Sequence, residues 1–313
     1  MRVCAKTPGK LIRLGCMCAA IGLLSPHGSG GVRAMPPQGG IEAFHVQGNV
    51  YLLAGADANV AVQVGEDGVL VVDTGGAGRR EEILESIRRL SDGPIRWMVN
   101  THVHSDHTGG NESISQAGTT VNGNPAAIVA HESVPLHMVE AGRPLTERPV
   151  NTFFESRRDF YFNGEAIFLY HVPRAHTDGD IIVYFRDSDV LVAGDLFVTT
   201  TFPVIDLELG GGIDGFIDGL NTMLDITVPA HLQEGGTYVI PGHGRVGDEA
   251  DLVEYRDMVQ IIRDRIRPMV DRGMTLAEVL RAEPALDYAS RYDNGGPWTT
   301  EMFVEAAYRS LSD

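Results

Sequence analysis

Four side chains able to bind a metal ion lie within six residues of one another in the stretch THVHSDHTGG, residues 101–110. A short apolar run, residues 95–99, precedes them and reads as a buried strand. In an extended chain, residues two apart face the same side, so His102 and His104 are expected to point together. A helix would place residues two apart on different faces. The cluster is therefore predicted on a strand end and the loop that follows it.

Asp106 and His107 come next, where the chain is expected to turn. Their side chains can therefore reach a second metal position beside the one that His102 and His104 face. Gly109 and Gly110 are expected to give the backbone the freedom to leave the cluster. Histidine is scarce in this chain, with 11 in 313 residues, and three of them beside an aspartate have little structural use. The stretch therefore indicates a metal site rather than an ordinary polar loop.

Three further candidates follow apolar, strand-like runs later in the chain. His176 lies in Arg-Ala-His-Thr-Asp-Gly, Asp195 ends Val-Ala-Gly-Asp, and His243 lies in Ile-Pro-Gly-His-Gly. Loops that follow strands gather at one edge of a sheet, where such side chains can converge. We expect these three residues to meet the first cluster.

Apolar periodicity and turn residues predict strands that alternate with helices in two successive sections, which is typical of sheets covered by helices. The expected strands are 41–46, 50–54, 60–64, 70–73, 95–99, 126–130, 166–171, 181–185 and 190–193. The expected helices lie near 83–90, 215–224, 249–271, 276–281 and 300–311.

In this order, the motifs resemble those of the metallo-β-lactamase superfamily, from about Ile41 to the C-terminal helix. The resemblance implies a four-layer αββα sandwich of the α/β class, with two zinc ions at one edge. By position it implies that Asp195 bridges the two ions and that each ion has three further ligands. These would be His102, His104 and His176 for the first zinc, and Asp106, His107 and His243 for the second.

This donor set suits Zn²⁺, which accepts histidine nitrogen and carboxylate oxygen and leaves a position for water in catalytic sites. The resemblance implies a hydrolase in which a metal-bound hydroxide attacks the substrate and Asp106 also orients this nucleophile. Histidine and carboxylate also suit iron. There are two alternatives to a zinc hydrolase. One is an iron-containing redox enzyme acting on oxygen or sulfur species, and the other is a metal-binding accessory protein.

Residues 1–34 read as a secretory signal peptide, and 35–313 as one metallo-β-lactamase-like domain. Four basic residues surround an apolar run from Leu11 to Leu24, which is too short to span a bilayer, and Val-Arg-Ala34 offers a cleavage site. All three cysteines lie in this leader, so no thiolate is expected among the ligands. We therefore expect a periplasmic or secreted protein without stable membrane insertion.

Charge and composition limit the substrate. Five of the 25 basic residues lie in residues 1–34, which leaves the rest with a net charge of −22 when histidine is neutral. So acidic a domain argues against nucleic acid as a partner. It also has no lysine to grip the carboxylate of a β-lactam, and Asp195 stands where related β-lactamases commonly have cysteine. We predict a small-molecule substrate with an ester, lactone or amide (β-lactam-like) bond.

Residues outside the seven ligands are expected to have supporting roles. Asp73, in Val-Val-Asp-Thr-Gly, is predicted to orient a ligand. His131 is predicted to be structural or to support the site, and His171 to be a core histidine. Asp178 and Asp180 are expected to form a turn.

Overall fold

The computed structural model describes residues 39–233 and 235–312, and the predicted signal peptide, residues 1–34, lies outside them. The described part from Gly39 onward forms one compact unit. None of its helices is both long enough and apolar enough to span a membrane.

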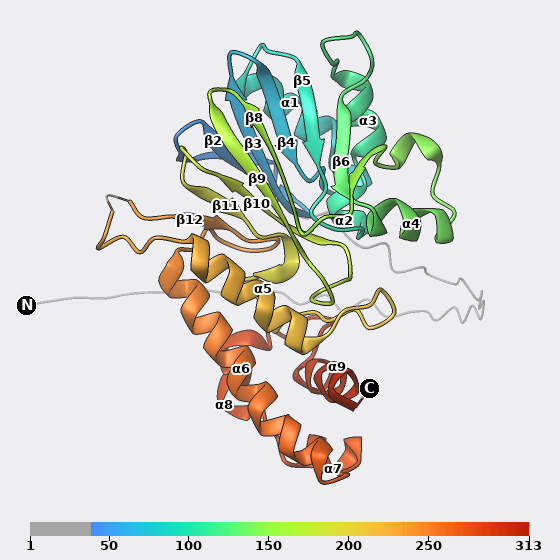
Figure 1. The fold of residues 1–313 in the computed structure, drawn as a ribbon, viewed down its shortest axis with the longest axis vertical. Helices are drawn as coiled ribbons and strands as arrows, with labels where there is room; N and C mark the ends of the chain where they lie inside the picture. Colours follow the sequence, from blue (N-terminus) through green and yellow to red (C-terminus); the bar gives the residue numbers. More distant parts are fainter. Residues whose placement is uncertain (1–38, 234, 313) are drawn as a thin grey trace, which may run out of the picture. The chain divides into compact units, whose positions relative to one another are not determined.

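The first sheet has seven strands that follow one another in sequence order (Figure 1). Its first four strands pair antiparallel, and its last four pair parallel. The strands are β1 (Glu42–Gln47), β2 (Val50–Ala56), β3 (Ala58–Gly65), β4 (Gly68–Val72), β5 (Ile95–Val99), β6 (Ala127–His131) and β7 (Asn151–Phe153). The carboxyl ends of β4 and β5 therefore lie side by side.

The second sheet has five strands in the order β12-β11-β10-β9-β8. Its strands are β8 (Arg157–Phe162), β9 (Glu165–Val172), β10 (Asp180–Phe185), β11 (Val190–Val192) and β12 (Tyr238–Ile240). The pair β11–β12 is parallel, so the segments that carry Asp195 and His243 leave the sheet side by side.

The two sheets share one apolar core. It combines residues of the first sheet, such as Leu70 and Val99, with residues of the second, such as Leu169 and Val183. Along β9 buried and partly buried residues alternate, as expected when one face of a strand packs on a core.

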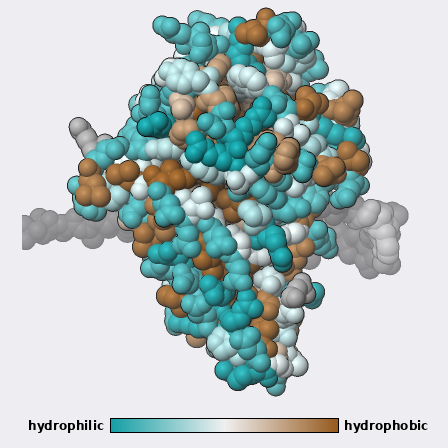
Figure 2. All heavy atoms as spheres, viewed as in Figure 1, coloured by the Kyte–Doolittle hydropathy of each residue, from teal (hydrophilic) through white to brown (hydrophobic). Residues whose placement is uncertain are grey.

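Helices cover the outer face of each sheet. On the first sheet, Ile83 and Ile87 of α1 (Arg80–Leu90) and Ile114 of α3 (Asn111–Ala117) pack against β-strand residues. The second sheet is covered by α5 (Ile213–Ile226), α6 (Glu249–Asp271), α7 (Leu276–Arg281), α8 (Leu286–Tyr292) and α9 (Thr300–Ser312). The four-layer αββα sandwich is thus confirmed. Figure 2 shows mainly hydrophilic residues over the helices in view, with apolar residues in small groups.

Most predicted strands and helices are present with bounds shifted by a few residues. The pattern missed β7, β8 and β12, as well as α3, α8 and α4 (Ser133–Glu140). Strand β8 begins Arg-Arg-Asp, which does not read as apolar alternation, and α4 contains Pro135 in its first turn, where proline is tolerated.

Candidate metal centre

The first cluster of candidate ligands leaves the carboxyl end of β5. His102 and His104 lie in the non-helical segment after this strand, as predicted, with ring centroids 4.9 Å apart. Asp106 and His107 differ from the expectation of a loop, because they belong to a single-turn helix, α2 (Ser105–Thr108). This turn places the side chains of Asp106 and His107 beside those of His102 and His104, in a second group.

Gly109 and Gly110 have a different role from the predicted one. Both adopt ordinary helical backbone angles, with φ of −66° and −89°, so neither supplies unusual flexibility. A Cβ atom at Gly109 would lie 2.4 Å from the backbone nitrogen of Ala77, and one at Gly110 would lie 2.4 Å from the carbonyl oxygen of Thr74. These glycines allow the segment after α2 to pack directly on the chain that leaves β4.

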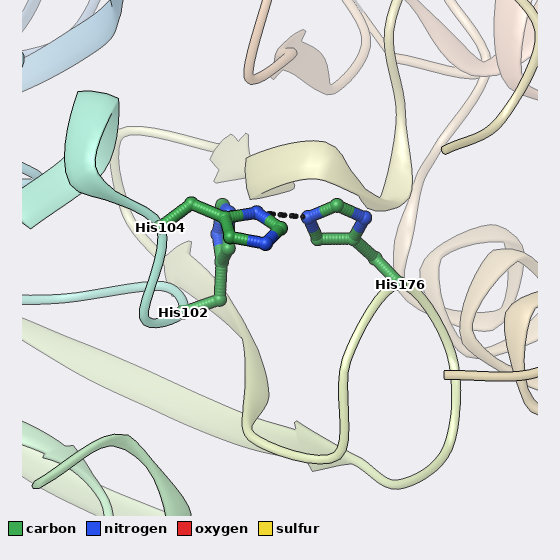
Figure 3. Close-up of side chains that lie close together, drawn as sticks. All are labelled: His102, His104 and His176. Carbon is green, nitrogen blue, oxygen red and sulfur yellow. Dashed lines mark hydrogen bonds between the residues drawn. The ribbon is translucent and has the colours of Figure 1, made fainter. Parts of the chain in front are cut away.

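His102, His104 and His176 form the first group of candidate ligands (Figure 3). His176 comes from the β9–β10 connection, and its ring is turned toward the other two. Nδ1 of His104 lies 3.2 Å from Nε2 of His102 and 2.9 Å from Nε2 of His176. Two nitrogens bound to one tetrahedral zinc at ~2.0–2.1 Å lie about 3.3 Å apart. The spacing of the three histidines therefore suits a single metal ion.

Asp106, His107 and His243 form a second group beside the first. Oδ2 of Asp106 lies 3.2 Å from Nε2 of His243 and 3.9 Å from Nε2 of His107. His243 follows β12, so the group joins the ends of β5 and β12 across the two sheets.

Asp195 faces both groups. It lies in a short 3-10 turn, Gly194–Leu196, after β11. Its Oδ1 is 3.2 Å from Nε2 of His107 and 3.5 Å from Nε2 of His243, while its Oδ2 is 3.7 Å from Nε2 of His176. All seven residues singled out in the sequence therefore converge, with Asp195 in the position expected of a bridging carboxylate.

Three of these histidines donate an N–H away from the centre, which leaves the lone pair of the other ring nitrogen facing the centre. His107 donates from Nδ1 to Asp73 at 2.7 Å, and His176 donates from Nδ1 to the carbonyl oxygen of Val204 at 2.8 Å. His104 donates from Nε2 to Asp206 at 3.0 Å. A neutral imidazole has one N–H, so in the neutral form of each ring the inward nitrogen carries no proton.

His102 follows the same rule. Thr101 Oγ1 donates to Asp73 at 2.7 Å and so accepts from Nδ1 of His102 at 3.1 Å. Unprotonated nitrogens that face one another at about 3 Å repel unless a cation lies between them.

Two buried atoms at the centre lack a hydrogen-bond partner among the described residues. They are Nε2 of His107 and Oδ1 of Asp195, which lie 3.2 Å apart but do not have the geometry of a hydrogen bond. An unpaired buried polar atom is costly, and a divalent ion would satisfy both. Gly242 preserves this arrangement, because a Cβ atom there would lie 1.9 Å from Oδ1 of Asp195. The residues present therefore fit a metal centre.

Electrostatics differs among the ligands. Burial alone would lower the pKa of His107, but Asp195 and Asp73 raise it well above its usual value, so a metal ion would displace a proton from this ring. Burial, together with the neighbouring His107, lowers the pKa of His102, and burial lowers the pKa of His176 to about 4. Both rings are therefore neutral near pH 7. Burial alone would raise the pKa of Asp195, but the charge of the neighbouring His107 holds that pKa well below its usual range. Its carboxylate is ionised.

Asp73 supports the centre as predicted. Its carboxylate accepts from the backbone N–H of Thr101 at 2.8 Å as well as from His107, and so ties the two ends of the ligand loop together. Asp73 has a φ of +61°, a conformation that aspartate tolerates better than most residues.

Asp206 was not identified from the sequence. It lies in the connection between β11 and α5, in no recognisable motif, and its contact with His104 depends on how this connection folds back. The surrounding sequence gave no signal that could have singled it out.

The remaining histidines lie outside the seven-residue cluster. His131 at the end of β6 stacks on His171, with ring centroids 3.5 Å apart. His171 is half-buried rather than a core residue, and its Nε2 donates to the carbonyl oxygen of Asp178 at 2.8 Å. Asp180 accepts from the backbone and hydroxyl of Thr177, as expected of a turn. These residues brace the β9–β10 connection that carries His176.

Comparison with known proteins identifies the family of the chain. The sequence profile described as the metallo-beta-lactamase superfamily matches residues 46–243. A linear primary-alkylsulfatase from a Pseudomonas species is 24% identical over 268 residues, which cover 70% of this chain and 49% of that protein. A type 2 metallo-beta-lactamase from Bacillus cereus is 22% identical over 194 residues, which cover 62% of this chain and 69% of that enzyme.

A solved structure shares the architecture. The inverting sec-alkylsulfatase Pisa1 from a Pseudomonas species superposes with a TM-score of 0.64 at 15% identity, over 86% of this chain and 50% of that chain. This chain thus spans about half the length of the alkylsulfatases that it matches. At such identity, the structural match establishes the fold alone.

Proposed function

The chain belongs to the metallo-β-lactamase superfamily, and from this premise we propose that it is an exported zinc-dependent hydrolase of small-molecule esters, lactones or amides. The proposal rests chiefly on one observation. Four histidines each place one ring nitrogen on an outward hydrogen-bond partner, so in their neutral forms their other nitrogens face a common centre without a proton. A divalent cation makes this arrangement favourable, and a full ligand set is what a hydrolytic metal centre needs.

Two zinc ions held there would supply Lewis acidity and would lower the pKa of a shared water to near 7. His102, His104 and His176 would hold the first ion. Asp106, His107 and His243 would hold the second, and Asp195 would lie between them. The exposed groups mark the side from which substrate arrives: the side chains of Asp106 and His243 are 37% and 31% exposed, whereas His107 is fully buried.

Asp106 is placed to act on the reacting molecule itself. Its carboxylate is more exposed than that of Asp195 and lies at the mouth of the centre. There it can accept a proton from the attacking water or orient that water. Its Oδ2 lies 3.2 Å from Nε2 of His243, which fixes the carboxylate.

Ester substrates are favoured over β-lactams. Similar proteins include both an alkylsulfatase and a β-lactamase by name. Residues 35–313 contain no lysine to bind a β-lactam carboxylate and no cysteine for the second zinc. We therefore place ester bonds, of carboxylic or sulfuric acids, ahead of the lactam bond.

Metal analysis combined with a panel of substrates tests this function. The purified protein is assayed with p-nitrophenyl esters, a lactone, a thioester, an alkyl sulfate and nitrocefin, after its zinc and iron contents are measured. About two zinc ions per chain with turnover of an ester supports the proposal. Bound iron with oxygen consumption and no hydrolysis would contradict it and favour the redox alternative.

Export is a separate part of the proposal. It rests on the basic and apolar pattern of residues 1–34, which predicts cleavage after Ala34. Mass spectrometry of the protein from a periplasmic extract is expected to give an N-terminus at Met35. Full-length protein confined to the cytoplasm would contradict export without affecting the metal chemistry.

A further inference from the structure

A groove of about 460 Å³ lies between α9 and the connection that follows β11. Its walls are largely apolar and include Val204, Ile205, Leu207, Trp298, Met302 and Ala306. Such a concave, mostly apolar surface with a few polar groups is typical of small-molecule sites.

The groove adjoins the metal centre. Asp206, whose Oδ2 accepts from His104 at 3.0 Å, also lines the groove. The side chains of Asp206 and His104 are 26% and 28% exposed, so solvent reaches both residues where the groove adjoins the centre. Val204, another wall residue, holds His176 through its carbonyl oxygen. A molecule whose reacting bond lies at the centre can therefore extend into the groove.

Part of the apolar wall is open to solvent, and its tryptophan is held in place. Met302 is 43% exposed, although it lies on α9 among apolar neighbours. The Trp298 indole donates from Nε1 to the carbonyl oxygen of Pro203 at 3.1 Å, which holds the ring against the connection. Apolar surface held open in this way favours an apolar occupant, because covering it removes that surface from water.

The charges around the groove select against an anionic occupant. Asp206, Glu208 and Glu305 line it together with Arg309, and Arg309 pairs with Glu305 at 2.5 Å. The pair leaves two carboxylates uncompensated within the lining. A carboxylate or sulfate at the far end of a ligand would meet like charge, whereas a neutral chain would not.

We propose that this groove binds the neutral apolar chain of an ester whose ester bond lies at the metal centre. This inference rests on the proposed hydrolytic function and narrows its substrates to esters with an acyl or alkyl chain of several carbons. Met302 and Trp298 are then specificity-determining residues, since they contact the chain and not the reacting atoms.

Binding is tested first without catalysis. The chain has two tryptophans, so in a Trp97→Phe background the fluorescence reports on Trp298 alone. Titration with 1-octanol is expected to shift this emission to the blue, because the bound alcohol removes the indole from water. Met302→Gln is expected to weaken octanol binding about fivefold. Ile261→Gln, at a 40% exposed apolar residue of α6, is the matched control and is expected to change nothing.

Kinetics then tests the role in turnover. Across p-nitrophenyl acetate, butyrate and octanoate, kcat/KM is expected to rise about twofold per added methylene, because an open groove buries part of each group. Met302→Gln should remove most of this rise. Ile261→Gln should keep both the rise and the wild-type rate with acetate.

The failures of the two proposals are distinguishable. A flat chain-length profile with no response of Trp298 to octanol would overturn the groove assignment while ester hydrolysis stood. Absence of hydrolysis for every ester, with octanol still bound, would overturn the proposed function and with it the use of the groove by an ester substrate.

Discussion

Oδ2 of Asp73 lies 2.7 Å from Nδ1 of His107 and 2.7 Å from Oγ1 of Thr101, so one buried carboxylate fixes both the ring of a candidate ligand and the start of the ligand loop. The carboxylate keeps the proton of His107 on the outer nitrogen. The inner nitrogen is thereby free for a metal ion.

Asp73→Asn is expected to weaken zinc binding about 10–100-fold, because the amide replaces one accepting oxygen with an NH2 donor and cannot accept from both Thr101 N–H and His107 as the carboxylate does. Competition with a chromophoric chelator measures this affinity. Asp189→Asn is the matched control, since Asp189 is also buried, also has a positive φ of 49°, and also accepts from several side chains, but lies away from the centre. Equal affinities in the two variants would contradict the role of Asp73.

Asp206→Asn is expected to have a smaller effect, because His104 and Asp206 are both partly exposed and water can replace the lost contact. We expect a loss of zinc affinity of about tenfold or less. The same competition assay compares this variant with Asp73→Asn. A larger loss of zinc affinity in Asp206→Asn than in Asp73→Asn would contradict the expectation that the more buried contact matters more.

Gly242→Ala is expected to displace Asp195, because the new Cβ atom would lie 1.9 Å from Oδ1 of that residue and 2.8 Å from the carbonyl carbon of Gly194. Overpacking of this kind costs about 1–3 kcal/mol of unfolding free energy. Urea denaturation and hydrolysis rates measure the two effects. Gly78→Ala serves as the control, since a Cβ atom there has no neighbour within 4 Å among the described residues. Wild-type activity in Gly242→Ala would contradict the bridging position of Asp195.

His131 is expected to make the fold sensitive to acid. Burial, together with the stacked His171, lowers the pKa of His131 to about 4 from 6.5. Between these values the unfolded chain takes up a proton and the folded chain does not, so the free energy of unfolding falls as the pH falls. From pH 7 to 4.5 the wild type should lose about 1–2 kcal/mol more than His131→Gln, after allowance for solvent screening.

Urea denaturation at the two pH values gives this difference. His45→Gln, at an exposed histidine of β1, is the control and should keep the wild-type dependence. Identical pH profiles for the wild type and His131→Gln would contradict the prediction.

The sequence alone predicted the seven converging residues because each follows a strand, and parallel strands end at one edge of a sheet. The His-x-His spacing predicted that His102 and His104 point to the same side. It did not reveal that Asp106 and His107 lie in a helical turn, since four residues are too few to show helical periodicity. Nor did it indicate the packing role of Gly109, which depends on the distant Ala77.

The contacts that support the ligands were harder to predict. Asp73 was found because it lies in a recurrent turn at the end of a strand. Asp206 and the wall formed by Trp298 were not, because each depends on how a connection of irregular structure packs against α9. Such contacts join segments that no local pattern connects.

The metal content of the wild type and of His243→Ala, measured by mass spectrometry of purified protein, tests the central claim most directly. His243 belongs to one group of ligands and not to the other. The account predicts about two zinc ions in the wild type and about one in His243→Ala, with His45→Ala unchanged. A wild-type protein that takes up no divalent metal, or a His243→Ala variant that keeps both ions, would contradict it.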